Sequence, residues 1–447
     1  MVTEPLDSHD RILSLAEKIH RAEARITVIG IGYVGLPLSL AFARTGFPVH
    51  GLDIDPRKVA SLLEGASYVD DVSDAHVADL VNAGRFSPTS DPAILNQADV
   101  VVICVPTPYT KAKQPDLTCI YQAASMVVEH LHPGMLVVLE STTYPGTTQE
   151  VLQPLLEARG LICGRDFELA YSPERVDPGN PRFTLQNTPK IVSGVTKRAT
   201  EMAVALYGRL AETVVPVSTP RVAEMAKLME NTFRHVNIGL ANEMAILCGK
   251  LGIDIWEVID AAATKPFGFM PFYPGPGVGG HCIPIDPYYF AWKVQEEDSR
   301  ARLIELAGDI NDRMPDYVVE KVGDALNDRG KSLRGCRILV LGVAYKNNVG
   351  DVRESPALKV IQRLHRKGAA VEYHDPHVPM FLNGAGPMYS TPLTEELVRQ
   401  ADCVIVLTAH RDLPYAMIAA NASLVVDTRN ALALSGHFVP GRNIIRL

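Results

Sequence analysis

The segment from Arg25 to Asp53 constrains the fold more than any other part of the 447-residue chain. It consists of a short apolar run, a glycine-containing turn, a stretch with apolar residues at helical spacing, and a second apolar run. This order predicts a strand, a helix and a second, parallel strand. Gly30, Gly32 and Gly35 form a G-x-G-x-x-G pattern where the helix begins. Each glycine is needed because it has no Cβ: one allows the tight turn, one allows a pyrophosphate to approach, and one allows the helix to pack closely. The pattern therefore predicts a dinucleotide site.

Asp53 ends the second strand of this unit, ~20 residues after the glycines, which is the spacing that the dinucleotide pattern predicts. A carboxylate there accepts hydrogen bonds from the ribose hydroxyls and repels a 2′-phosphate. The sequence therefore predicts NAD rather than NADP, although Arg57 nearby is a cation that could meet such a phosphate. The structural alternative is a tight turn that binds no cofactor.

A second strand, helix, strand unit begins at Arg337 and repeats the first in pattern. RITVIG is matched by RILVLG, VHGLDID by VEYHDP, and ADVVVICVPT by ADCVIVLTAH. Further strands of a parallel sheet covered by helices are predicted at residues 100–105, 136–139 and 191–193. We therefore expect an α/β protein with two doubly wound, Rossmann-like domains joined by a long central helical region. The expected domains are residues 1–220, 221–330 and 331–447.

Residues 221–263 contain no proline, and their apolar residues recur at helical spacing, which predicts one long helix followed by a helical turn region. The apolar stripe of such a helix must be covered, so we expect a homodimer. The segment KPFGFMPFYPGPGVGGHCIPIDPYY follows, and its density of proline and glycine excludes regular structure. A loop of this length usually has a function.

Composition narrows the classes of partner. Hydrophobic residues make up 47% and charged residues 21% of the chain, as in ordinary globular proteins. The net charge of -8 gives no general reason to bind nucleic acid or an anionic membrane, and no signal peptide or membrane span is predicted. The seven cysteines include no Cys-x-x-Cys pair, so neither a disulfide framework nor a metal site is expected. A cytoplasmic protein with small-molecule partners is the expectation.

Cys282 is the cysteine whose surroundings do not suggest packing. It lies in GPGVGGHCIPIDP, between glycines and prolines, whereas packing cysteines usually lie within apolar strands or helices. His281 could be a base, but it is more simply part of the loop structure or a substrate contact. Asp286, four residues after the cysteine, is a candidate for positioning water or a partner side chain.

Lys227 and Asn231 are four residues apart on the predicted long helix and so share one face. A cation and an amide presented together could stabilise an oxyanion, although on spacing alone a solvated helix lysine is the simpler interpretation. Glu174, in SPERVDPG, offers a carboxylate just past a strand, where the alternative is an ordinary turn.

The second strand, helix, strand unit keeps only Gly342 of the three glycines, so it is not expected to bind a pyrophosphate in the same way. Lys346, Arg353 and Arg429 lie at or just beyond its predicted strand ends, where open α/β sheets bind ligands. They could meet phosphates there, and for each of them a solvated surface cation is the alternative.

These motifs, in this order, resemble the UDP-glucose/UDP-N-acetylhexosamine dehydrogenase family from Arg25 to about Arg429. The family's cysteine loop, G-x-G-x-G-G-x-C-x-P-x-D, is matched between Gly275 and Asp286. Its K-x-x-x-N helix is matched at Lys227 and Asn231, and STTYPGT, SPERVDPG and AYKNNVGDVRESP are similar to its other landmarks. The resemblance implies that the first domain binds NAD and that the last binds the UDP part of a UDP-sugar.

The resemblance also implies roles for individual residues. Cys282 is implied as the nucleophile, Lys227 and Asn231 as oxyanion partners, and Glu174, Asp286 and Thr142 as the groups around water and protons. The residues expected at the cofactor are Gly30, Gly32, Tyr33, Val34, Gly35, Asp53, Arg57, Thr107, Thr142 and Arg353. Those expected at the substrate are Glu174, Arg175, Lys227, Asn231, Arg234, Tyr273, Gly279, Lys346 and Arg429.

The implied reaction is a four-electron oxidation of the sugar C6 alcohol to a carboxylate, through a thiohemiacetal and a thioester on Cys282. Ile285 stands where many UDP-glucose enzymes have lysine, which favours an N-acetylated sugar, UDP-N-acetylglucosamine above all. UDP-N-acetylmannosamine and UDP-glucose are the alternative substrates. The rival functions are a two-electron hydroxy-acid dehydrogenase, which needs no Cys282, and a non-catalytic nucleotide sensor.

Overall fold

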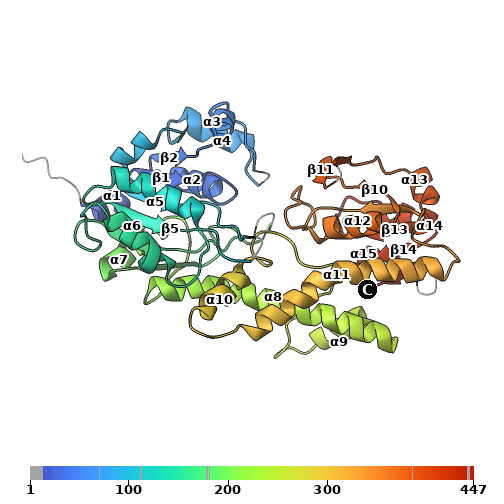
Figure 1. Ribbon diagram of the computed structural model, residues 1–447. Coiled ribbons are helices and arrows are strands. Elements are labelled where there is room, and N and C mark those ends of the chain that lie inside the picture. Colours follow the sequence, from blue (N-terminus) through green and yellow to red (C-terminus); the bar gives the residue numbers. More distant parts are fainter. Residues whose placement is uncertain are drawn as a thin grey trace, which may run out of the picture. The chain divides into compact units, whose positions relative to one another are not determined.

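The computed structural model describes residues 14–69, 71–110, 113–177, 180, 182–384, 386–439 and 443–447. The chain divides into two compact units, the first ending at Leu228 and the second beginning at Met229. Each contains one parallel-dominant sheet (Figure 1). Among the described residues, no helix combines the length and the apolar character needed to cross a bilayer.

The sheet of the first unit has the order β3-β2-β1-β4-β5-β6-β7-β8. Its strands are β1 (Ile26–Ile29), β2 (Val49–Leu52), β3 (Phe86–Thr89), β4 (Val100–Ile103), β5 (Leu136–Leu139), β6 (Glu168–Tyr171), β7 (Lys190–Gly194) and β8 (Val214–Pro216). The central strands β1, β4 and β5 are buried throughout, as expected of strands covered on both faces. The strand order reverses between β1 and β4, which places the switch point of a doubly wound sheet after β1.

One edge of this sheet departs from the parallel arrangement that the sequence predicts. β7 pairs with β6 in the antiparallel sense, and β8 then runs parallel to β7. A parallel neighbour requires a crossover connection, usually a helix, and the described residues between β6 and β7 form none. The two strands therefore meet in opposite directions.

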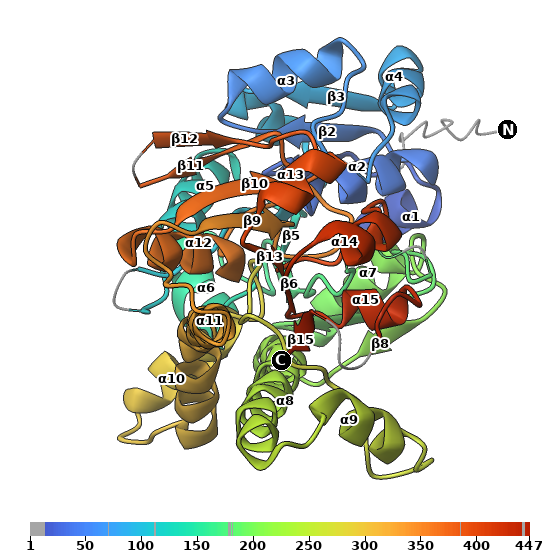
Figure 2. The ribbon, with the colours of Figure 1, turned by 90° about the vertical axis from the view of Figure 1, so that its right-hand side faces the viewer.

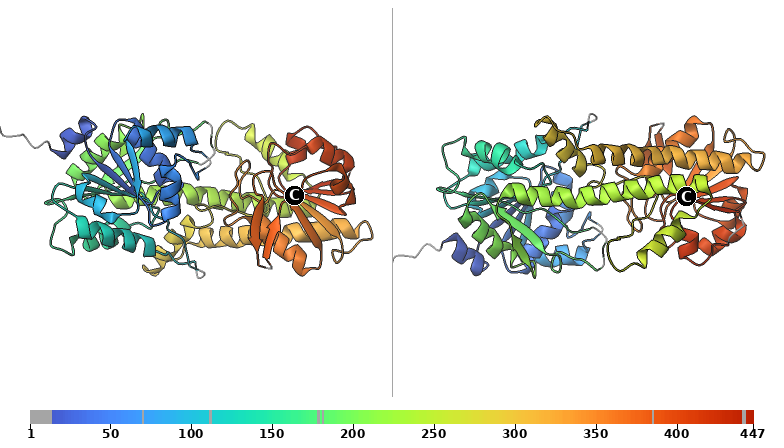
Figure 3. Two further views of the ribbon diagram at one scale, coloured as in Figure 1. Left: turned by 90° about the horizontal axis from the view of Figure 1, so that it is seen from above. Right: turned by 90° about the horizontal axis from the view of Figure 1, so that it is seen from below.

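Helices cover both faces of the first sheet, and the apolar stripe of α2 packs against β1 in the main core. The helical elements of this unit are α1 (Leu15–His20), α2 (Gly35–Arg44), α3 (Pro56–Leu63), α4 (Asp74–Asn82), η1 (Pro92–Gln97), α5 (Thr118–His130), η2 (Thr147–Leu152), α6 (Gln153–Glu157), α7 (Lys197–Tyr207) and the first turns of α8 (Pro220–Leu251). The predicted long helix is thus α8, a single uninterrupted helix, which Figure 3 shows along its length.

The second unit begins within α8 and continues with α9 (Ile255–Ala263), α10 (Asp286–Gln295) and α11 (Arg302–Asn327). Helices α8 and α11 lie close together, because a Cβ on Gly239 would be only 2.9 Å from the Cβ of Ala307. Between α9 and α10 the chain has no regular structure, as its proline and glycine content predicts.

The sheet of the second unit has the order β10-β9-β13-β14-β15 and is wholly parallel (Figure 2). Along β9, Ile338 and Val340 face one core and Leu339 and Leu341 face the other, so both faces are covered by helices. The strands are β9 (Arg337–Leu341), β10 (Ala370–His374), β13 (Cys403–Val406), β14 (Val425–Asp427) and β15 (Ile444–Arg446), with a separate hairpin of β11 (Met380–Asn383) and β12 (Gly386–Tyr389). The covering helices are α12 (Pro356–Arg366), α13 (Glu395–Gln400), α14 (Tyr415–Asn421) and α15 (Ala431–Leu434).

The repeat predicted from the sequence is present in backbone detail. After β1, the N–H of Gly30 donates to the carbonyl of Leu52, at 2.8 Å. After β9, the N–H of Gly342 donates to the carbonyl of His374, at 2.9 Å. The two units therefore present equivalent turns at equivalent switch points, which confirms the prediction of two doubly wound folds connected through a helical region.

Candidate active site

The glycine turn of the first unit lies between β1 and α2. Gly30 has φ +87°, and a Cβ on it would lie 2.7 Å from the carbonyl oxygen of Cys104. A Cβ on Gly35 would lie 1.9 Å from the carbonyl oxygen of Gly30. A Cβ on Gly32, by contrast, would meet no atom within 4 Å. The first two positions require glycine for the fold itself, whereas Gly32 borders open space at the start of α2, where a pyrophosphate fits.

Asp53 lies at the C-terminal end of β2 and is 7% exposed. Its Oδ2 accepts hydrogen bonds from the N–H of Ile31 (3.2 Å) and from Nζ of Lys58 (3.0 Å). Arg57 is turned away, because its Nη2 pairs with Asp55 at 2.8 Å and its side chain is 89% exposed. The guanidinium of Arg57 lowers the pKa of Asp55 to about 2. Lys58, rather than Arg57, is therefore the cation beside the expected ribose position.

An open groove lies beside the end of β2, and its lining suits a planar base. Two of its lining residues are apolar and exposed: Ile54, which follows Asp53, is 77% exposed, and Tyr121 of α5 is 46% exposed. The remaining lining residues are Thr118, Gln122, Ser125 and Met126. The glycine turn, the carboxylate and this groove together fit a dinucleotide.

Replacing Asp53 with Ala should narrow the preference for NAD over NADP by about 10- to 100-fold, because the carboxylate is a charged hydrogen-bond partner for ribose and repels a 2′-phosphate. The measurement is the ratio of kcat/KM for the two cofactors. Asp166→Asn is the matched control, since Asp166 precedes β6 at the opposite end of the sheet and an amide oxygen can still accept from the N–H of Ile162, so the ratio should be unchanged. Equal efficiency with both cofactors in the unmutated protein would contradict the assignment.

Glu174 belongs to a buried ionic cluster that the sequence did not predict. Nζ of Lys190, at the start of β7, lies 2.9 Å from Oε2 of Glu140 and 3.1 Å from Oε2 of Glu174. The hydroxyl of Tyr207 donates to Oε1 of Glu140, at 2.5 Å. The other oxygen of Glu174 accepts from the backbone N–H groups of Arg175 and Val176. Glu174 is thus held in one orientation from both sides.

The charges in this cluster are distributed unequally. Burial acts to raise the pKa of Glu174, but Lys190 and the hydrogen bond from the N–H of Val176 outweigh it and hold that pKa below its ordinary value. Burial raises the pKa of Glu140 in spite of Lys190. The two carboxylates raise the pKa of Lys190 against its own burial. At neutral pH Glu174 is therefore an anion oriented by a buried cation.

Lys227 lies on the part of α8 that belongs to the first unit, and it is only 8% exposed. This burial is not expected of a solvated helix lysine, and the charge of Lys227 helps to lower the pKa of Glu174. One turn earlier, the buried carboxylate of Glu224 accepts hydrogen bonds from the N–H groups of Gly146 and Thr148. Glu224 thereby fixes the start of α8 against the loop after β5, which contains the half-buried Thr142.

Cys282 is exposed in the second unit and ends the glycine-containing part of the loop. Its carbonyl accepts from the N–H groups of Ile285 (3.1 Å) and Asp286 (2.8 Å), in a turn that starts α10. Asp286 is buried, and its Oδ2 accepts from Nδ2 of Asn231 on α8, at 2.6 Å. The structure therefore brings together the amide and one carboxylate predicted for the site. Lys227 lies one turn before Asn231 on the same helix.

His281 lies beside an ion pair of the second unit. Its Nε2 lies 3.8 Å from Oδ2 of Asp351, and Asp351 accepts two hydrogen bonds from the guanidinium of Arg353. Burial and the charge of Arg353 lower the pKa of His281, against the opposing effect of Asp351. The imidazole is therefore neutral at physiological pH, and its neighbours favour a role in loop structure.

The Cys282 loop packs directly against the predicted substrate-binding edge of the second sheet. A Cβ on Gly275 would lie 2.5 Å from Nη1 of Arg429, and one on Gly279 would lie 2.8 Å from the carbonyl oxygen of Glu354. The N–H of Gly280 donates to the carbonyl of Arg353. Asn242 of α8 accepts from the N–H of Gly275 and so fixes the start of this loop.

Arg429 follows β14 and is partly buried. Its Nε donates to the carbonyl of Leu407, at 3.0 Å. Burial lowers the pKa of its guanidinium to about 10, and the nearby Asp427 acts in the opposite direction. Arg429 therefore stays cationic at neutral pH and is well suited to a phosphate. Lys346, half-buried in the loop after β9, lies at the same edge of the sheet.

The other predicted cofactor residues lie at the C-terminal ends of β1 and β4. Tyr33 and Val34 are 44% and 37% exposed in the glycine turn. Thr107 is half-buried in the loop after β4.

Three predicted substrate residues are spread over both units. Nη1 of Arg175 donates to the carbonyl of Pro189, at 2.5 Å. Arg234 is exposed on α8. The hydroxyl of Tyr273 donates to Asp260, and its ring stacks on Trp256 with centroids 5.6 Å apart.

Sequence reasoning missed Lys58, Glu140, Lys190 and Glu224. A signal existed for two of them, because Glu140 directly follows the apolar run LVVL and Lys190 directly precedes the apolar pair Ile191 and Val192, where an unpaired charge would be costly. No local pattern indicates that these two side chains pair with each other across 50 residues.

Three domain families match consecutive parts of the chain. The NAD binding domain of the UDP-glucose/GDP-mannose dehydrogenase family matches residues 24–211. The central domain of that family matches residues 221–313, and its UDP binding domain matches residues 339–434.

Individual relatives are similar over most of their length. UDP-N-acetyl-D-mannosamine dehydrogenase of Methanocaldococcus jannaschii is 36% identical over 422 residues, which cover 91% of this chain and 92% of the relative. UDP-N-acetyl-D-glucosamine 6-dehydrogenase of Pseudomonas aeruginosa is 37% identical over 358 residues, covering 80% and 83%. The solved structure of UDP-D-ManNAc dehydrogenase from Pyrococcus horikoshii superposes with a TM-score of 0.86 at 33% identity, covering 94% of this chain and 98% of that one. With its NAD-binding and UDP-binding domains in the same order, the chain belongs to the UDP-glucose/GDP-mannose dehydrogenase family.

Proposed function

We propose that this protein oxidises the C6 alcohol of a UDP-N-acetylhexosamine to the carboxylate, with Cys282 as a covalent nucleophile. The observation that supports this most is the exposed Cys282 in a loop packed against Arg429 and Arg353, at the sheet edge of the matched UDP binding domain. We assign residues 1–220 to NAD, residues 221–330 to the central region with the cysteine loop, and residues 331–447 to the UDP-sugar.

The proposed chemistry needs a heteroatom because an aldehyde cannot lose a second hydride directly. NAD, when bound, accepts one hydride in each of two oxidations. Between them, the thiolate of Cys282 adds to the aldehyde carbon and gives a thiohemiacetal, whose oxidation leaves a thioester. Water then hydrolyses the thioester, which releases the carboxylate and restores the thiol. Lys227 and Asn231 are assigned to the oxyanion, where one well-placed donor typically contributes ~3 to 4 kcal/mol.

The carboxylates are assigned by their environments. Glu174 is an oriented anion beside Lys190, so it is suited to accept a proton from water or to hold that water in place. Asp286 accepts from Asn231 and so orients the amide toward its proposed target. Thr142 is assigned to the same water. The cofactor is assigned to Gly30, Gly32, Tyr33, Val34, Gly35, Asp53, Thr107, Thr142 and Arg353, with Lys58 in place of Arg57 beside the ribose.

Ile285 and the GGHC loop favour an acetamido sugar, and we expect UDP-N-acetylglucosamine to exceed UDP-glucose in kcat/KM by at least about 10-fold. The physical reason is that a methyl-bearing acetamide gains an apolar contact that a hydroxyl cannot make. NADH formation with a panel of UDP-sugars measures this, with GDP-mannose, which differs in both base and sugar, as the negative control. A higher kcat/KM for UDP-glucose would contradict the choice of sugar.

UDP-N-acetylmannosamine is the second candidate substrate. Several relatives are UDP-N-acetyl-D-mannosamine dehydrogenases, including the one from Methanocaldococcus jannaschii, and this similarity favours it. It differs from UDP-N-acetylglucosamine only in the configuration at C2, so the same panel decides between them.

We also propose a homodimer through the second-unit part of α8. Apolar side chains project into solvent along this helix, and a stripe of this kind usually marks an interface. They are Met229, Phe233, Leu240, Met244, Leu247 and Leu251. Sedimentation of the purified protein tests the proposal, and a monomer at micromolar concentration would contradict it.

A further inference from the structure

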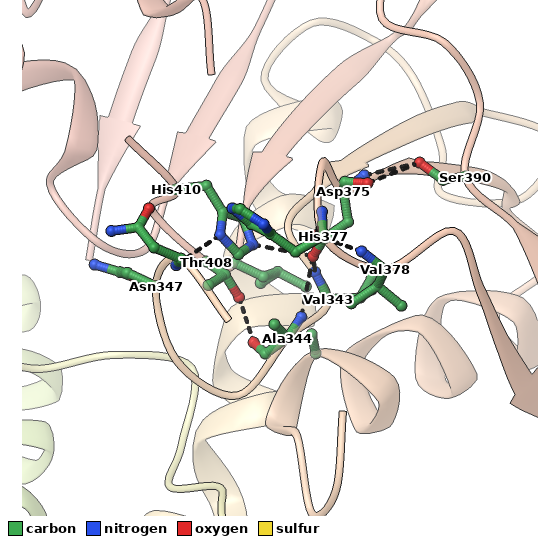
Figure 4. Close-up of polar contacts among 12 residues, drawn as sticks. Val343, Ala344, Asn347, Asp375, His377, Val378, Ser390, Thr408 and His410 are labelled. Atoms are coloured by element: carbon green, nitrogen blue, oxygen red, sulfur yellow. Dashed lines mark hydrogen bonds and ion pairs between the residues drawn. The ribbon is translucent and has the colours of Figure 1, made fainter. Parts of the chain in front are cut away.

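Asp375, at the C-terminal end of β10, occupies the position in the second unit that Asp53 occupies in the first. Its side chain is fully buried, and its carboxylate accepts hydrogen bonds from the protein groups around it (Figure 4). Oδ2 accepts from the N–H groups of Val343 (2.7 Å) and Ala344 (3.1 Å), directly after β9. Oδ1 accepts from the N–H groups of His377 and Val378. The carboxylate at the position that the first unit offers to the ribose is therefore used wholly inside the fold in the second unit.

His410, after β13, completes this arrangement and is also fully buried. Its Nε2 lies 3.0 Å from Oδ2 of Asp375, and its Nδ1 lies 2.9 Å from the backbone nitrogen of Asn348. Because a backbone N–H can only donate, Nδ1 must be the acceptor and the ring proton must be on Nε2. The imidazole thus accepts from Asn348 and donates to Asp375. Burial acts to raise the pKa of Asp375, but His410 and the backbone N–H groups outweigh it and keep the carboxyl ionised.

Asp375, His410 and their neighbours after β13 hold the loop of residues 343–348 on both sides of Lys346. Before Lys346, Ala344 donates to Asp375, and its carbonyl accepts from the hydroxyl of Thr408 at 2.6 Å. After Lys346, the side-chain oxygen of Asn347 accepts from the N–H of Ala409, at 3.1 Å. Next to it, Asn348 bonds to His410.

Asn348 itself is held in an uncommon backbone conformation, with φ +60°. Its side-chain oxygen accepts from the N–H of Arg411, at 2.8 Å. A non-glycine residue adopts this region at some cost, so the surrounding bonds must fix it. The conformation of the loop around Lys346 therefore depends on the bonds made by the segment from Thr408 to Arg411.

We infer that Asp375 and His410 are positioning residues for the nucleotide-sugar site: they hold the 343–348 loop in the conformation that presents Lys346 to the ligand. The inference rests on the proposed function of that loop. Neither residue is assigned a contact with the substrate. A preorganised loop binds more tightly because no conformational freedom is lost on binding, so loosening the loop should weaken affinity for the UDP part.

Two substitutions at His410 separate this role from a general loss of packing. In His410→Asn the amide oxygen can take the place of Nδ1, so the acceptor for Asn348 is kept and the donor to Asp375 is lost. In His410→Gln the amide nitrogen can take the place of Nε2, so the donor to Asp375 is kept and the acceptor for Asn348 is lost. Tyr373→Phe is the control, because it removes the contacts of a buried hydroxyl with the carbonyls of Val378 and Met388 in the same unit.

The experiment is calorimetric titration of each full-length variant with UDP, together with NAD binding, melting temperature and the kinetic constants for the UDP-sugar. We expect His410→Gln to raise the Kd for UDP about 10-fold or more and to raise KM more than it lowers kcat, with NAD binding unchanged. His410→Asn and Tyr373→Phe should stay within about 3-fold of the unmutated protein.

Three results would overturn the inference. One is an equal Kd for UDP in the unmutated protein and both His410 variants, which leaves the proposed function intact. Another is a loss of affinity that simply follows the loss of melting temperature, Tyr373→Phe included. The third is no UDP binding by the unmutated protein, which removes the proposed function as well.

Discussion

Cys282→Ser should lower steady-state turnover by several orders of magnitude while leaving the binding of NAD and UDP-sugar almost unchanged. A serine hydroxyl is far less acidic than a thiol, and it is both a poorer nucleophile toward the aldehyde and a poorer leaving group from the acyl intermediate. The second oxidation or the release of the carboxylate should therefore stall. Steady-state NADH formation measures the turnover, and calorimetric titration with NAD and with the UDP-sugar measures the binding.

Cys163→Ser is the matched control for this substitution. Cys163 is a partly buried cysteine of the first unit, and burial raises the pKa of its thiol to about 12, so it stays protonated at neutral pH. This variant should retain near-normal activity. If Cys282→Ser also retained near-normal turnover to the carboxylate, Cys282 would have a structural role and the covalent mechanism would have to be abandoned.

Lys190→Met should lower the free energy of unfolding of the first unit by about 3 to 5 kcal/mol, because it leaves the buried carboxylate of Glu140 without its cation. The corresponding fall in melting temperature is on the order of 10 °C. The double variant Lys190→Met/Glu140→Gln should recover part of the loss, since the buried charge is then gone and the amide oxygen can still accept from Tyr207. Scanning calorimetry of both variants measures the effect.

The stability lost in Lys190→Met should depend on pH in a definite direction. Burial raises the pKa of Glu140 even with Lys190 present, and removal of the cation should raise it further. A group whose pKa is higher in the folded than in the unfolded chain stabilises the fold at low pH, and this contribution is lost as pH rises through the folded pKa. The decrease in the free energy of unfolding caused by Lys190→Met should therefore be smaller at about pH 5 than at about pH 8.

Lys197→Met provides the comparison for Lys190→Met. Lys197 is 91% exposed on α7 and lies 3.6 Å from Glu201, an exposed pair of a kind that contributes little to stability. Its replacement should change the free energy of unfolding by less than about 0.5 kcal/mol. Equal effects at Lys190 and Lys197 would show that the buried cluster does not stabilise the first unit.

The local patterns in the sequence predicted the parts of the fold that depend on neighbouring residues. Residue spacing within a single element or turn was enough to predict three features. They are the turn at Gly30, the carboxylate of Asp53 at the end of the next strand, and the continuous helix through Lys227. The repeat beginning at Arg337 follows from the same spacing.

The parts that were not predicted depend on contacts between distant residues. Lys190 meets Glu140 only because β7 and β5 lie in the same sheet, and no periodicity encodes that contact. The antiparallel pairing of β7 with β6 depends on the connection between them, which has no helical pattern to be recognised. In the second unit, Asp375 ends a strand as Asp53 does, yet only the position of His410 shows that its carboxylate is used internally.

We propose that one active site takes a UDP-sugar alcohol through a four-electron oxidation to the carboxylate, with Cys282 as the nucleophile. The most direct measurement is the number of NADH molecules formed for each UDP-sugar molecule consumed, with mass analysis of the Cys282 peptide from protein quenched during turnover. We expect two NADH per sugar and a sugar-sized adduct on that peptide. One NADH per sugar, with aldehyde as the product and no adduct on Cys282, would contradict it.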